Sequence, residues 1–214
     1  MRLNTTSLSL VNTFMLIDDV KCLNAIVDSN FMRALPRRKR EREAGLDCDQ
    51  YLGEVMQFEA FRERAYSSSI RYGLILLLYS IIETELDRFR VRFLSSHGKK
   101  IQLPNGKSSD NSKLAKMKRS FGQVKLSPPP EWKYFDLLDV KYRDVRNVIA
   151  HEYGICKEQG KLFEMEGLSI ADDGAITIKS EFVAEMARTA RLFFEELFYD
   201  HGFRVNGRTK KTKI

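Results

Sequence analysis

The sequence has few of the residues that mark disulfide-bonded or metal-binding proteins. Only three cysteines, Cys22, Cys48 and Cys156, occur in 214 residues, and they are far apart, without CxxC spacing or a neighbouring histidine. A disulfide framework and a zinc site are therefore not expected, and a reducing cytoplasm is the predicted location. We expect the protein to need no metal and no other cofactor.

Long apolar runs and several well-known motifs are also missing. The longest apolar stretch, from Gly73 through Ile82, is about half of the roughly 20 residues that span a bilayer, and the N-terminus does not resemble a signal peptide. We therefore expect no association with a membrane. No phosphate-binding glycine loop, dinucleotide fingerprint or Gly-x-Ser-x-Gly elbow is present, so nucleotide hydrolysis and serine-hydrolase chemistry have no support.

Basic residues and apolar residues are abundant. Lys and Arg outnumber Asp and Glu by 36 to 29, which gives a net charge of +7 and suits a polyanionic partner such as nucleic acid. Hydrophobic residues make up 43% of the chain, enough to bury a core.

Apolar residues near the N-terminus recur every three or four positions, which predicts a helix with one buried face. That face is expected to comprise Leu16, Val20, Leu23, Val27 and Phe31. Pro36 and the basic run at 37–42 predict that the helix ends and a solvated linker follows, although the run also resembles a nuclear-import tract.

A long helical stretch is expected to follow, beginning near Asp47 or Asp49, either of which can cap it, and ending at His97-Gly98. Gly73 could bend or interrupt it. Its predicted buried face is Ile75, Tyr79, Ile82, Leu86, Phe89 and Phe93.

The second half of the chain predicts shorter elements. A basic helix from Lys113 to Phe121 precedes a helix from Glu131 to about Tyr153, which Gly154 ends. Alternating apolar runs around Asp173-Gly174 predict a β-hairpin. Ser180 then caps a last helix, whose predicted buried face is Phe182, Met186, Ala190, Phe193 and Leu197.

These patterns predict an all-α fold of four to five helices, with a small β-hairpin inserted before the last helix. We expect three parts along the chain: an N-terminal helix and basic linker at 1–45, a helical domain at 46–206, and a basic flexible tail at 207–214.

The helix that ends at Gly154 carries the most informative polar residues. At about 100° per residue, Arg143, Arg146, Asn147 and His151 lie on one side of it. Tyr153 is expected two turns after Arg146 on the same side. The opposite side is apolar and is formed by Tyr142, Val145, Val148 and Ile149.

This polar side contains the groups needed for RNA cleavage by the 2′-hydroxyl. His151 can move a proton near neutral pH, and Arg146 can stabilise the charge that develops on the phosphate. Asn147 and His151 are an i,i+4 pair, so the amide is expected to orient the imidazole. No carboxylate cluster with metal-ligand spacing accompanies them.

The spacing of Arg and His alone is weakly specific, and a similar pair, Arg92 and His97, occurs at the end of the preceding long helix. That pair lacks both the Asn after the Arg and the Tyr two positions after the His. We interpret it as a solvated helix terminus. A merely polar helix surface is the competing interpretation for Arg146, Asn147 and His151.

The segment from Arg146 to His151, followed by Glu152 and Tyr153, resembles the signature of the HEPN superfamily, in its Arg-x4-His-x-Tyr form. That form is found in HEPN toxins paired with MNT nucleotidyltransferase antitoxins, which adenylylate the tyrosine. The architectural similarity covers about residues 60 to 200. Glu83 or Glu85, within the long helix, resembles the supporting acidic residue of many members.

The resemblance implies a HEPN-like helical bundle, usually a homodimer through the motif helices. It implies metal-independent endoribonuclease activity that leaves a 2′,3′-cyclic phosphate, often in toxin–antitoxin or antiphage defence systems. By position, Arg146 would stabilise the phosphate, His151 would be the acid–base and Asn147 would position it. Tyr153 would be the modified residue. Any antitoxin, nucleotidyltransferase-like in such pairs, would be a separate protein.

Further basic residues could contact the RNA backbone, namely Arg143 on the motif helix and Lys116, Lys118 and Arg119 on the basic helix. A solvated helix explains the latter three equally well. Two alternatives to a nuclease remain open: a catalytically inactive HEPN module that binds RNA or a partner protein, and a toxin subunit regulated by adenylylation of Tyr153.

Overall fold

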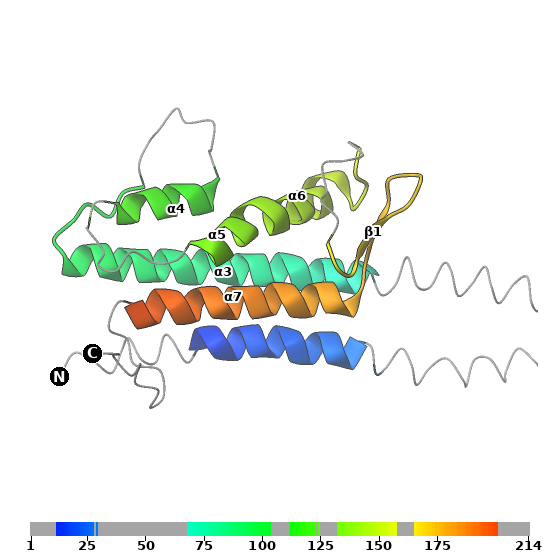
Figure 1. Cartoon of the computed structure of the whole chain (residues 1–214), viewed down its shortest axis with the longest axis horizontal. Coiled ribbons are helices and arrows are strands. Elements are labelled where there is room, and N and C mark those ends of the chain that lie inside the picture. Colours follow the sequence, from blue (N-terminus) through cyan, green and yellow to red (C-terminus); the bar gives the residue numbers. More distant parts are fainter. Residues whose placement is uncertain are drawn as a thin grey trace, which may run out of the picture. The chain divides into compact units, whose positions relative to one another are not determined.

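The computed structural model describes residues 12–27 and 29, 68–103, 112–122 and 124, 132–157, and 165–200 (Figure 1). These residues are mostly helical, with one two-stranded antiparallel hairpin before the last helix, which confirms the predicted fold class. The predicted basic linker, the start of the long helix near Asp47, Cys48 and the C-terminal tail lie outside the described residues.

The chain divides into two compact units. The first unit takes residues 1–18, 78–143 and 186–214, and the second takes 19–77 and 144–185. Three helices are divided between the units, so that one part of each belongs to the first unit and the other part to the second. They are the N-terminal helix, α3 (Ser68–Ser96) and α7 (Ser180–Asp200). No helix in the described ranges combines the length and the apolar character needed to cross a membrane.

The N-terminal helix, residues 12–27 (blue in Figure 1), buries a face that matches the predicted one only in part. Leu16 and Leu23 are 40% and 45% exposed, whereas Thr13 and Asn24 are buried. Phe31 lies outside the described residues. Val20 is buried as predicted, but the rest of the buried face consists of Phe14 and Ile17 and of the two polar residues. Thr13 donates to Glu85 Oε2 (3.0 Å) and Asn24 to the Ser180 carbonyl (3.1 Å). Apolar periodicity does not detect a buried polar residue whose hydrogen bonds are satisfied.

Helix α3 confirms its predicted face, because all six of its expected apolar residues are buried. The helix ends at Ser96, and Gly98 adopts a positive φ of 62°. The Lys99 amide donates to the Leu94 carbonyl (2.9 Å), so a carbonyl in the last turn is hydrogen-bonded although the helix does not continue.

Aromatic rings make up much of the core of the first unit. Trp132 packs against Phe121, Phe135 and Phe193, at centroid distances of 6.0, 5.3 and 6.3 Å. Phe89 makes similar contacts with Phe93, Phe121 and Phe198. Rings of this size bury large apolar areas, so they dominate the stability of the unit.

Helix α4 (Lys113–Phe121) has the predicted bounds. Ser112 caps it, because its Oγ accepts a hydrogen bond from the Ala115 amide at 2.9 Å.

The next helical stretch has a local irregularity that the sequence did not predict. It consists of α5 (Lys133–Asp136), a π-helical segment η2 (Leu137–Tyr142) and α6 (Arg143–Glu152). The expected single α-helix is thus widened just before the motif. Such π-helical segments are rare and often occur near functional sites.

The hairpin pairs β1 (Leu168–Ile170) with β2 (Ile176–Ile178), as predicted from Asp173-Gly174. Gly174 has a φ of 82°, which favours glycine at this turn. Helix α7 follows from Ser180, and all five residues of its predicted face are buried.

Candidate functional site

Helix α6 has two distinct sides, as its sequence predicts. Val145, Val148 and Ile149 are buried. On the other side, Arg146 and Asn147 are partly exposed, and Ala150 and His151 are exposed. Arg146, Asn147 and His151 therefore lie on the side of α6 that is open to solvent, and all three belong to the second unit.

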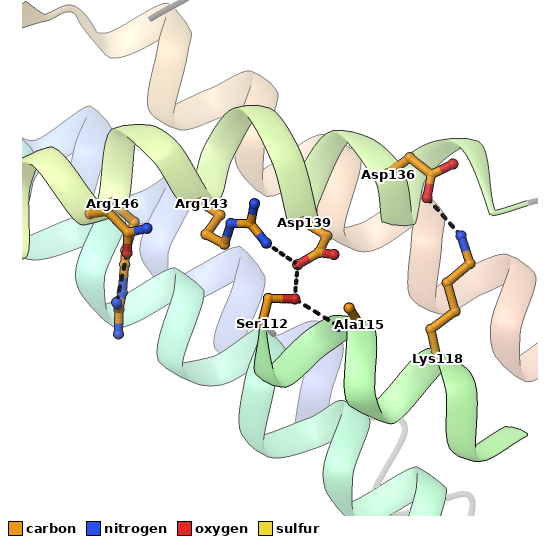
Figure 2. A network of polar contacts seen from close by, with 8 residues as sticks. Ser112, Ala115, Lys118, Asp136, Asp139, Arg143 and Arg146 are labelled. Carbon is orange, nitrogen blue, oxygen red and sulfur yellow. Dashed lines mark hydrogen bonds and ion pairs between the residues drawn. The ribbon is translucent and has the colours of Figure 1, made fainter. Parts of the chain in front are cut away.

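Asn147 contacts Arg146 rather than His151. Arg146 Nη1 donates to Asn147 Oδ1 at 2.9 Å, the contact drawn at Arg146 in Figure 2. This bond orients the guanidinium on the exposed side of α6. The expected contact between Asn147 and His151 is not among the hydrogen bonds of the described residues. The positioning of His151 by Asn147 stays a prediction.

Tyr153 is not on the helical face where it was expected. Helix α6 ends at Glu152, and Tyr153 adopts a left-handed φ of 55°. The next residue, Gly154, is also left-handed (φ 79°), and its amide donates to the Val148 carbonyl at 3.0 Å. Tyr153 therefore lies beyond the helix and is 89% exposed.

Arg143, which lies in the first unit, makes an ion pair. Its Nη1 is 3.3 Å from Oδ1 of Asp139, a buried residue in η2, and its side chain is 28% exposed. The same Oδ1 accepts a hydrogen bond from Ser112 Oγ at 2.6 Å (Figure 2). Asp139 thus joins the cap of α4 to the first residue of α6. Asp139 was not predicted as a site residue, although its i,i+4 spacing from Arg143 was a signal.

The three predicted RNA-contacting residues of α4 differ in their surroundings. Lys118 donates to Asp136 Oδ1 at 2.7 Å (Figure 2). Its ammonium also lies over the rings of Trp132 and Phe135, at 5.3 and 4.9 Å from their centroids. The positive charge of Lys118 therefore interacts with groups of the protein itself. Lys116 is partly exposed and Arg119 exposed.

The two acidic candidates in α3 have partners within the first unit. Glu85 is buried and accepts hydrogen bonds from Thr13 (3.0 Å) and Arg88. Glu83 is more exposed and pairs with Lys113 at 3.3 Å. A catalytic supporting role for either carboxylate stays a prediction.

His97, from the second Arg–His pair, contacts its own helix end. Its Nδ1 lies 2.8 Å from the Phe93 carbonyl oxygen, and its ring lies 4.4 Å from the Phe93 ring, centroid to centroid. These contacts are those of a residue that completes a helix terminus.

The Ser112–Asp139 contact gives a stability prediction. We expect Ser112→Ala to lower the free energy of unfolding by about 2 kcal/mol, because it removes a helix cap and one hydrogen bond to a buried carboxylate. Denaturant unfolding measures this change. Ser80→Ala, at an exposed position in α3, is the matched control and should stay within about 0.5 kcal/mol. Equal stabilities for the two variants would contradict the structural role of this contact.

Among the described residues, no group of three or more His, Cys, Asp or Glu side chains could hold a metal ion. The absence of a metal requirement stays a prediction. Comparison with models of protein families, with curated proteins and with solved structures finds no match to this chain.

Proposed function

We propose that this protein is a metal-independent endoribonuclease of HEPN type, which cleaves RNA to leave a 2′,3′-cyclic phosphate. One observation carries the proposal: Arg146, Asn147 and His151 lie on the solvent-accessible side of α6, while the opposite side is buried. The residue types and their order, rather than the fold, support this chemistry.

In the proposed reaction, His151 accepts the proton of a ribose 2′-hydroxyl, and the oxygen attacks the adjacent phosphorus. The bond from phosphorus to the 5′-oxygen of the next nucleotide breaks, and the proton carried by His151 passes to that oxygen. The products are a cyclic phosphate and a free 5′-hydroxyl, so water is not consumed in this step.

Arg146 has the chemistry to stabilise the negative charge that builds on the phosphate oxygens. Its fork of N–H donors fits a phosphate, and Asn147 already occupies one of them, which restricts the rotation of the guanidinium. Preoriented donors are more effective because they need not reorganise as charge develops.

The wider biological role follows from the resemblance of the motif. A toxin or antiphage-defence effector, a homodimer, a cytoplasmic location and a separate nucleotidyltransferase-like antitoxin acting on Tyr153 are all part of the proposal. The net charge of +7 supports RNA as the partner.

The direct test is incubation of the purified chain with end-labelled RNA in the presence of EDTA. We expect cleavage to persist, the new ends to carry 2′,3′-cyclic phosphate and 5′-hydroxyl groups, and DNA of the same sequence to stay intact because it lacks the 2′-hydroxyl. Cleavage that needs a divalent cation, or products with 3′-hydroxyl ends, would contradict the proposed chemistry. RNA that is bound and left intact would favour the inactive binding module.

A further inference from the structure

We infer that Tyr72 of α3 is a positioning residue that holds the C-terminal end of the motif helix against the β-hairpin. The inference rests on the proposed function for its catalytic consequence, because the helix end that it holds carries His151. Sequence analysis gave no signal for Tyr72, since its partners are distant in the sequence. All residues of this contact belong to the second unit.

The first contact is between the ring of Tyr72 and the backbone of Gly154. A Cβ atom placed on Gly154 would lie 2.6 Å from Tyr72 Cε2 and 2.7 Å from its hydroxyl oxygen. The ring therefore occupies the space that any side chain at position 154 would need. Gly154 is required here both for its left-handed backbone and for this close approach.

The second contact joins the same tyrosine to the hairpin. The Tyr72 hydroxyl donates to the Ile176 carbonyl at the start of β2. The Ile176 amide in turn donates to the Gly154 carbonyl at 2.9 Å. Tyr72, Ile176 and Gly154 thus form a closed set of contacts between α3, the hairpin and the end of α6.

Two further backbone contacts extend this attachment. The Cys156 amide donates to the Gly174 carbonyl at 2.8 Å, and Ile155 pairs with Ala175 as an isolated β-bridge. The segment after α6 is consequently fixed along the hairpin. Tyr153 lies between the helix and this segment, in a conformation that a bulky residue rarely adopts without support from its surroundings.

The hydroxyl of Tyr72 is suited to a permanent structural role. Burial raises the pKa of Tyr72 from its usual 10.0, so the group stays a neutral donor across the physiological range. Because the folded state holds this proton more tightly than the unfolded state, the folded protein keeps the full stability of the neutral phenol below pH 10.0. That stability is lost as the pH rises through the pKa of Tyr72 in the folded state. Its partner is a backbone carbonyl, so Tyr72 acts on His151 only through the position of the helix end.

The test compares Tyr72→Phe, which keeps the ring and removes the hydroxyl, with Tyr134→Phe as a control at a partly exposed tyrosine of α5. For Tyr72→Phe we expect kcat to fall about tenfold with KM unchanged, because small displacements of a catalytic group slow the reaction more than they weaken binding. Tyr134→Phe should retain both values. An unchanged kcat, with or without a change in KM, would overturn the catalytic part of the inference.

Amide hydrogen exchange provides a readout that does not depend on activity. Tyr72→Phe should speed exchange of the Ile176 and Gly154 amides by about tenfold, while the Ala187 amide within α7 keeps its rate. Unchanged exchange at both amides would overturn the inference whatever the activity. An inactive wild-type chain would count against the proposed function alone, and the exchange rates would still decide whether Tyr72 holds the helix end.

Discussion

The His151→Ala variant is expected to lose RNA cleavage by a factor of about 100 to 10,000, the usual contribution of a positioned acid–base group. His151 is exposed on the last turn of α6, so its truncation should change the free energy of unfolding by no more than about 0.5 kcal/mol. Initial rates on labelled RNA, together with a thermal unfolding curve, separate a chemical defect from a folding defect.

The matched control for His151→Ala is His97→Ala. His97 contacts the Phe93 carbonyl and ring at the end of α3, so its removal should reduce stability slightly and leave cleavage at the wild-type rate. If His97→Ala were as inactive as His151→Ala, the wrong Arg–His pair would have been assigned. If His151→Ala kept full activity, the imidazole would have no part in the reaction.

Gly154→Ala is expected to lower the free energy of unfolding by about 2 to 5 kcal/mol. Two costs add: a left-handed backbone at a residue with a Cβ costs about 1 to 2 kcal/mol, and overpacking against a ring costs about 1 to 3 kcal/mol. Both apply because φ is 79° and the new Cβ would meet Tyr72 at 2.6 Å. Chemical denaturation measures the loss, and RNA cleavage should fall with it.

Substitutions at two other glycines measure the backbone cost and the packing cost separately. Gly98 has a φ of 62° but no atom within 4 Å of an added Cβ, so Gly98→Ala should show the backbone cost alone. Gly73 lies inside α3 with open space around it, so Gly73→Ala should stabilise the protein by about 1 kcal/mol through helix propensity. A Gly154→Ala variant no less stable than Gly98→Ala would show that the ring of Tyr72 yields easily.

Elements whose signals are local in sequence were predicted well. Helix α4, the hairpin at Asp173-Gly174 and the start of α7 at Ser180 depend on nearby capping and turn residues. The buried face of the N-terminal helix was predicted only in part: Val20 is buried, but Phe14 and Ile17 were missed. Thr13 and Asn24 were also missed, because they are buried through hydrogen bonds to partners 72 and 156 residues away. Such partners do not enter a periodicity argument.

In the candidate site, too, features that follow from local sequence were predictable and features that depend on side-chain conformation or distant partners were not. The exposed side of α6 follows from helical geometry, so the accessibility of Arg146 and His151 was predictable. The hydrogen bond between Arg146 and Asn147 depends on side-chain rotamers, which spacing does not determine. The end of the helix was predictable from Gly154, whereas the left-handed φ of Tyr153 and the contact of Gly154 with Tyr72, 82 positions before it, were not.

The hydrogen bond from Thr13 to Glu85 makes the early residues of the chain part of the interior of the first unit. Glu85 is 4% exposed, and its carboxylate is compensated by Thr13 and Arg88. Truncation of the chain ahead of α3 would remove the Thr13 donor together with the buried residues Phe14 and Ile17. A fragment that begins at α3 would therefore lack part of the interior of the first unit, so the N-terminal helix has to be kept when the chain is shortened.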